Sequence, residues 1–191
     1  MKAHLKLFLC ALACSLFAAC GGKDDDKHAT QAERAGIGAV TQSAGATPFV
    51  ARLSYAQRNF DHVASIDYRI APRPGAHSQA AAVSYDHAWL ERRAAWTAAA
   101  GNIAFPVFGL YANHRNELTV TTTFRDGSKH VAQVAVPTGG YSGPASVYAA
   151  PDIRRARGAS SPGFDYMLVR NGLTSPVVID TDGQLRWVGV G

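Results

Sequence analysis

The sequence has almost no cysteine, and none beyond residue 20. The three cysteines among the 191 residues are Cys10, Cys14 and Cys20. A chain cut just before Cys20 would keep that residue alone, at its new N-terminus. The rest of the chain therefore excludes a disulfide framework and any cysteine-based metal site.

Long hydrophobic runs are also scarce. The apolar run at residues 5–19 follows Lys2 and Lys6 and is too short for a comfortable membrane span. Such a pattern is typical of an export signal. Its end, Leu16-Phe-Ala-Ala-Cys20, resembles the acylation site of bacterial lipoproteins. We expect cleavage before Cys20 and lipid on its thiol, with an ordinary secretory signal as the alternative. Gly21, in place of an aspartate, favours the outer membrane, facing the periplasm or the cell surface.

The sequence has few charged residues of either sign, and its net charge is small. Loss of Lys2 and Lys6 with the signal lowers the formal net charge from +5 to +3, because no acidic residue is removed. An exported, mildly basic chain is not expected to bind nucleic acid. The remaining length, about 170 residues, suits one domain, or one domain and a fragment, with an adequate core.

Residues 20–46 are small and polar and include the charge run Lys23-Asp-Asp-Asp-Lys27. This composition predicts a flexible tether. A metal-binding or protease-recognition element is the alternative interpretation of the charge run, and a solvated linker is favoured over it.

From residue 47 the pattern changes to short segments that alternate apolar and polar side chains, as half-buried antiparallel strands do. The predicted strands are residues 49–55, 63–70, 80–85, 105–111, 117–124 and 129–136. Asp126-Gly127 predicts a hairpin turn between the last two, because glycine supplies a positive φ. Strands at this spacing indicate a mainly β fold, an immunoglobulin-like antiparallel β-sandwich over residues 47–136.

Residues 86–101 are ambiguous. They are rich in Ala and Arg, carry Trp89 and Trp96 seven positions apart and end in Gly101. One amphipathic helix fits this pattern, and a strand with a long loop fits equally well.

The last part of the chain reads as a linker and a hairpin. Residues 137–163 are rich in Pro, Gly, Ser and Ala, and Arg154, Arg155 and Arg157 are interpreted as a solvated loop, with an anion site as the alternative. In residues 164–191, Asp180-Thr-Asp-Gly183 predicts a turn between two strands rather than a calcium loop, which would need further oxygen ligands. We expect this hairpin to lack neighbouring strands, to be loosely docked and to expose Trp187.

Two motifs resemble a known family. Phe105-Pro-Val-Phe-Gly-Leu-Tyr-Ala-Asn-His-Arg-Asn-Glu-Leu-Thr-Val120 resembles a stretch in the N-terminal sandwich domain of bacterial arylsulfate sulfotransferases. Pro176-Val-Val-Ile-Asp-Thr-Asp-Gly-Gln-Leu-Arg-Trp187 is similar to the first hairpin of that family's β-propeller. The resemblance implies an immunoglobulin-like domain followed by a truncated propeller.

The family's chemistry is implied only for a full-length relative. There a propeller histidine is sulfated by an aryl sulfate and passes the sulfuryl group to a phenol, without a metal-ion or nucleotide cofactor. A neutral imidazole and surrounding cationic donors are needed. None of the family's propeller residues matches a position here, so the resemblance assigns no catalytic, cofactor-binding or metal-binding residue.

The histidines after residue 20 give weak candidates at best. They are His28, His62, His77, His87, His114 and His130. Asp61-His62 and Asp86-His87 are possible acid/base pairs, but adjacent strand residues point to opposite faces. Ser84 near His87 lacks a nucleophile elbow.

Two functions remain open. The first is a non-catalytic N-terminal portion of an arylsulfate sulfotransferase-like lipoprotein, with Cys20 as its lipidated residue. The second is a complete, lipid-anchored β-sandwich that binds a partner or glycan. The final hairpin favours the first, because a finished domain has little reason to close with unpaired strands. Oligomeric state and acceptor do not follow from the sequence.

Overall fold

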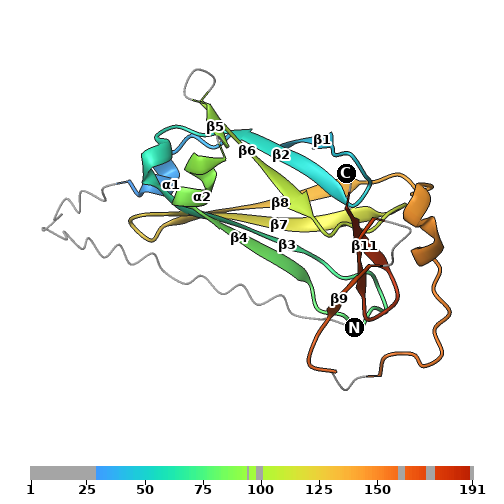
Figure 1. The fold of residues 1–191 in the computed structure, drawn as a ribbon. Helices are drawn as coiled ribbons and strands as arrows, with labels where there is room; N and C mark the ends of the chain where they lie inside the picture. Colours follow the sequence, from blue (N-terminus) through green and yellow to red (C-terminus); the bar gives the residue numbers. More distant parts are fainter. Residues whose placement is uncertain (1–28, 94, 98–100, 159–161, 171–174, 190–191) are drawn as a thin grey trace, which may run out of the picture.

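The structure is a computed structural model that describes residues 29–93, 95–97, 101–158, 162–170 and 175–189. The predicted export signal, Cys20, His28 and the charge run at residues 23–27 lie outside the described residues. The described residues are mainly strands, arranged in three antiparallel sheets (Figure 1).

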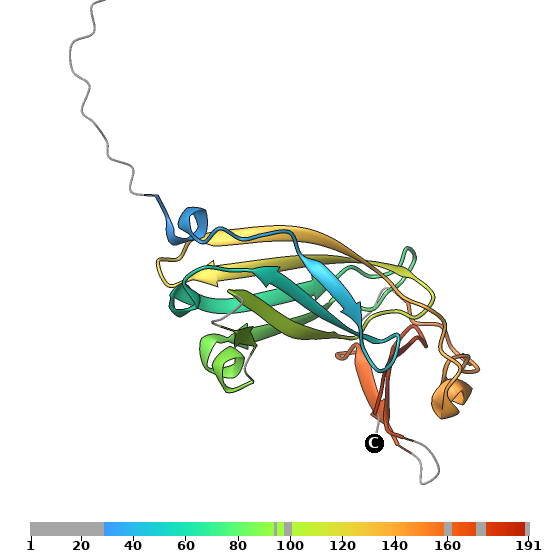
Figure 2. The ribbon, with the colours of Figure 1, turned by 90° about the horizontal axis from the view of Figure 1, so that it is seen from above.

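Two four-stranded sheets face each other (Figures 1 and 2). Sheet A has the order β1 (Thr41–Ala44), β2 (Val50–Ala56), β6 (Asn102–Phe108) and β5 (Trp96–Thr97). Sheet B has the order β4 (Ala81–Asp86), β3 (Val63–Ile70), β7 (Arg115–Phe124) and β8 (Lys129–Pro137). This arrangement confirms the predicted β-sandwich.

The sandwich is held by apolar side chains from the inner faces of both sheets. Along β7, buried and more exposed residues alternate, which places Leu118, Val120 and Phe124 in the core. Leu53 and Phe105 from sheet A lie in the same cluster. Burial of each such side chain stabilises the fold by roughly 1.5–3 kcal/mol.

The β7–β8 hairpin forms at the predicted Asp-Gly turn. Gly127 has a φ of 81°, a conformation that side chains with a Cβ rarely adopt. The Asp126 carboxylate accepts hydrogen bonds from the amide and hydroxyl of Ser128. The turn chemistry therefore fixes the register of the two longest strands.

The predicted tether is wrong in its second half. Helix α1 (Gln31–Arg34) has a capping box made by Thr30 and Glu33, and its first amides donate to Asp126 and Ser128 on the β7–β8 turn. Strand β1 then pairs with β2. Residues 30–44 thus belong to the sandwich, because a distant turn supplies acceptors for a short helix that is marginal alone.

Neither alternative for residues 86–101 was right. Asp86 caps a short helix, α2 (His87–Arg92), by accepting a hydrogen bond from the Trp89 amide. The chain then leaves the helix and forms β5, where Trp96 stacks on Phe60 with 5.2 Å between ring centroids. Phe60 lies in the 3₁₀ helix η1 (Phe60–His62).

The predicted orphan hairpin is also wrong, because a third strand pairs with it. Sheet C has the order β11 (Leu185–Val188), β10 (Val177–Asp180) and β9 (Tyr166–Val169). Val177, Ile179, Leu185 and Val188 form a second apolar cluster with Phe49 of the sandwich. The interval predicted as a linker adds the 3₁₀ helix η2 (Pro144–Tyr148) to this cluster through Ala145.

The elements are distributed between two ends of the sandwich. Helices α1 and α2 lie at one end, and sheet C and η2 lie at the other (Figures 1 and 2). Among the described residues, no helix has the length and apolar character needed to cross a membrane.

Candidate site at the junction of the sandwich and sheet C

Arg186 of β11 joins sheet C to the sandwich. Its side chain is only 1% exposed and forms an ion pair with Asp180, with 2.9 Å between Nη1 and Oδ2. Nε and Nη2 donate to the Gly109 carbonyl at 2.9 and 2.6 Å. Gly109 has a φ of 86° and ends β6 at Phe108, short of the predicted residue 111. A buried cation is tolerated here because it is both paired and hydrogen-bonded.

The Tyr111 ring lies beside two guanidinium groups. The Arg186 guanidinium carbon is 3.6 Å from the ring centroid, and that of Arg73 is 4.7 Å away. Tyr111 is buried, so these cation–π contacts occur away from water, where they contribute most. The ring thereby links the loop after β3 to sheet C.

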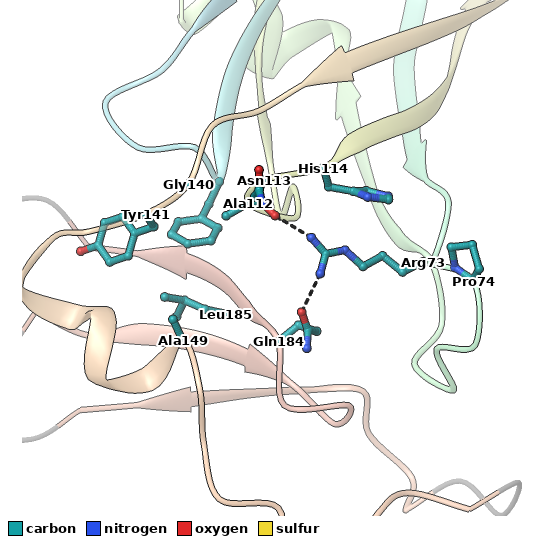
Figure 3. A pocket seen from close by; sticks show the side chains of 11 residues that line it. Arg73, Pro74, Ala112, Asn113, His114, Gly140, Tyr141, Ala149, Gln184 and Leu185 are labelled. Carbon is teal, nitrogen blue, oxygen red and sulfur yellow. Dashed lines mark hydrogen bonds between the residues drawn. The ribbon is translucent and has the colours of Figure 1, made fainter.

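Arg73 completes this link by hydrogen bonds. Its Nη1 donates to Gln184 Oε1 at 2.9 Å and its Nη2 to the Ala112 carbonyl at 2.5 Å (Figure 3). Both acceptors are neutral. Among the ion pairs of the described residues, none includes Arg73.

Two carboxylates bind the loop after β3. Asp182 accepts hydrogen bonds from the amides of His77 and Ser78, the latter at 2.7 Å. Burial opposes its ionisation, but the hydrogen bonds from Ser78 and His77 outweigh burial and lower the pKa of Asp182. Asp165 accepts from the Gln79 amide and from Arg157, whose hydrogen bond lowers the pKa of Asp165.

A cavity of about 490 Å³ lies between the sandwich and sheet C. Arg73, His114 and Gln184 lie on one side of it, and Tyr141, Leu185 and Ala149 lie on the other (Figure 3). Burial, and then the charge of Arg73, lowers the pKa of His114. Its imidazole is therefore neutral at physiological pH.

Residues 59–139, which run from η1 past the end of β8, match the arylsulfotransferase Ig-like domain family. This segment is an arylsulfotransferase Ig-like domain. No curated protein matches the chain. The match confirms the family resemblance for the Ig-like domain alone and includes Arg73, Tyr111 and His114. Sheet C follows it in the sequence, so the resemblance of residues 176–187 to a propeller hairpin stays a prediction.

Within this Ig-like domain the two Asp-His pairs have local structural roles. The Asp86 carboxylate caps α2, and the His87 ring stacks on Phe60 and places Nδ1 2.9 Å from the Val63 carbonyl oxygen. The backbone carbonyls of Asp61 and His62 accept hydrogen bonds from Arg125. Ser84 is exposed in β4, opposite Asp67 of β3. Of the remaining candidates, His77 pairs with Asp182 and His130 lies in β8.

The predicted Asp-Gly turn in the last hairpin is confirmed. Asp180 Oδ1 accepts from the amides of Asp182 and Gln184, and Gly183 has a φ of 80°. Among the described residues, no three potential His, Cys, Asp or Glu ligands are grouped around a metal position. Trp187 is half-buried rather than exposed. It lines a groove together with Val178 and with residues of β4.

Two arginines of the basic patch at residues 154–157 differ in burial. Arg154 is solvated, as predicted, and pairs with Asp152. Arg157 is buried, with its side chain 6% exposed, and binds Asp165 and Thr181. The solvated-loop interpretation is therefore wrong for Arg157.

Sequence reasoning missed the residues of the junction. Arg186 alternates with Leu185 and Trp187, a pattern that assigns it to the solvent face of a strand. One signal was available, because Asp180 and Arg186 carry opposite charges on the two arms of one hairpin. The contacts with Gly109 and Tyr111, more than seventy residues earlier, had no signal in the sequence.

Proposed function

We propose that the chain serves as a non-catalytic, lipid-anchored N-terminal module of the arylsulfate sulfotransferase kind. The match of residues 59–139 to the family's Ig-like domain carries this proposal. The junction supports it, because Arg186 binds both Asp180 and Tyr111 and so holds sheet C against the sandwich.

The proposed anchor is Cys20, acylated and inserted in the outer membrane. From Cys20 to the cap residue Thr30 the chain has about ten residues, which reach at most about 35 Å. The α1 end of the sandwich would therefore stay near the lipid. Sheet C lies at the opposite end of the sandwich from α1 (Figure 1), and Gln184 and Leu185 of its hairpin line the cavity.

Membrane partition tests the anchor. We expect the wild-type chain to incorporate labelled fatty acid and to sediment with membranes, and Cys20→Ser to do neither. Cys14→Ser is the matched control, since it lies within the predicted signal and should leave both properties unchanged. A Cys20→Ser chain that still sediments with membranes would refute the proposed anchor.

The purified chain should also transfer no sulfuryl group from a chromogenic aryl sulfate to a phenol.

A second candidate is a lipid-anchored β-sandwich that is functional alone as a binding module. The integration of sheet C favours it, because Val177 is fully buried and β10 has a partner strand on each side. Co-purification separates the two candidates. The first requires association with a sulfotransferase catalytic domain, whereas the second requires a ligand bound by this chain without one.

A further inference from the structure

The Arg73 charge has no anionic partner among the described residues. A guanidinium has five N–H groups, and the two bonds to Gln184 and Ala112 use two of them. Its Nε is buried, and no group of the described residues accepts a hydrogen bond from it. A half-buried cation in this state is poorly compensated, because it has lost part of its hydration.

The neighbouring carboxylates are already engaged. Asp180 pairs with Arg186, and Asp182 accepts amides of the loop after β3. Arg73 lines the cavity described above, and His114 on the same side is neutral. The cavity wall therefore carries a positive charge that the Tyr111 ring offsets only in part and that no carboxylate of the described residues pairs with.

The other wall of the cavity is apolar. Tyr141 packs on the buried Phe49 ring at 5.2 Å between centroids, and Leu185 lies beside them. The cavity volume, about 490 Å³, falls within the range of roughly 300–1,000 Å³ that small-molecule sites have. One cationic group opposite an apolar wall orients a ligand that has an anionic head and an apolar body.

We propose that this cavity binds a small organic carboxylate. The carboxylate lies against the remaining N–H groups of Arg73 Nη1 and Nη2, whose planar fork matches its geometry. Asn113 at the rim offers an additional amide donor. The apolar body of the ligand packs against Tyr141 and Leu185. This site is independent of the lipid anchor and of any sulfuryl transfer.

Titration with benzoate, followed by amide and histidine NMR of the Cys20→Ser chain, tests the site. We expect saturable shifts at Arg73, Ala112, His114 and Gln184, and a rise in the pKa of His114, because a nearby anion favours the imidazolium. Neutral benzamide should cause no such shifts. Phosphate should bind at least tenfold more weakly, because it lacks an apolar body. Phosphate binding as tight as benzoate binding would refute the apolar half of the site.

Substitutions locate the charge that binds. Arg73→Gln should weaken benzoate binding at least tenfold, and Arg73→Lys, which keeps the charge and loses the fork, should weaken it several-fold. If Arg73→Gln loses the dispersed NMR spectrum of a folded protein, the benzoate affinity of Arg73→Lys tests the proposal in its place. The control is Arg154→Gln, because Arg154 is 89% exposed and is not among the residues that line the cavity. Equal benzoate affinity in wild type and Arg73→Lys, or shifts spread over surface arginines, would overturn the proposal.

Discussion

The sandwich and the junction with sheet C are stabilised by different forces. Inside the sandwich, apolar side chains from both sheets form one continuous cluster. At the junction, the apolar cluster is small, and ion pairs, three cation–π contacts and charged hydrogen bonds accompany it. Burial of apolar area is non-directional, whereas the junction bonds depend on geometry and protonation. The junction should therefore be more sensitive to acid than the sandwich.

The comparison also explains where each region is vulnerable. A cavity in the sandwich affects strands of both sheets, because β2 and β6 share one core with β3 and β7. Loss of one charge at the junction leaves its partner buried and uncompensated, but the damage stays near sheet C. The predictions below separate these two responses.

The largest expected effect is global and comes from the sandwich core. Phe105 is fully buried and makes edge contacts with the rings of Tyr55 and Tyr85. Phe105→Ala should lower the free energy of unfolding by about 3–5 kcal/mol. Urea unfolding followed by circular dichroism measures this loss. Amide exchange should accelerate in β2, β3 and β7 as well as in β6, and acceleration confined to β6 would contradict a shared core.

A charge deletion at the junction should act locally. Arg186→Met leaves Asp180 buried without its cation, at a cost of about 3–5 kcal/mol to the docked state of sheet C. Amide protection should fall in residues 175–189 and stay unchanged in β3 and β7. Arg115→Met is the matched control, because Arg115 is exposed and its pair with Glu117 contributes about 1 kcal/mol or less. Equal loss of protection in the sandwich would show that the two regions unfold as one unit.

The same contrast explains what the sequence predicts and what it leaves out. Strand β3 has the predicted bounds, residues 63–70, because alternation along one strand is a local signal. The turn at Gly127 was predictable because its φ restricts the residue type. Arg186 was not, because its burial depends on the Gly109 carbonyl, and the docking of α1 depends on Asp126. Contacts of this kind join residues far apart in the sequence and leave no periodic pattern.

The smallest expected effect is a difference in pH response between the two regions. Burial raises the pKa of Tyr55 to about 12, from an ordinary value of about 10, although Thr122 of the opposite sheet hydrogen-bonds its hydroxyl. The neutral phenol is favoured in the folded state, so this stabilisation is complete below about pH 10 and is lost as the pH rises through 12.

At the junction, the shift in the pKa of Asp182 has the opposite sign, so stability is lost as the pH falls rather than as it rises. The lowered pKa of Asp182 means that its stabilisation is complete above its ordinary pKa of about 3.9 and is lost as the pH falls below that value. His114, whose pKa is also lowered, starts this loss below about pH 6.5. Amide exchange at a series of pH values should therefore show sheet C opening first in acid, whereas alkali should weaken both regions, because burial also raises the pKa of Tyr166 in β9. Asp182→Asn should reduce the acid response alone, and Tyr55→Phe should reduce the alkaline response alone. If either substitution changed both responses, protonation would act on the two regions together, and the physical distinction between them would be wrong.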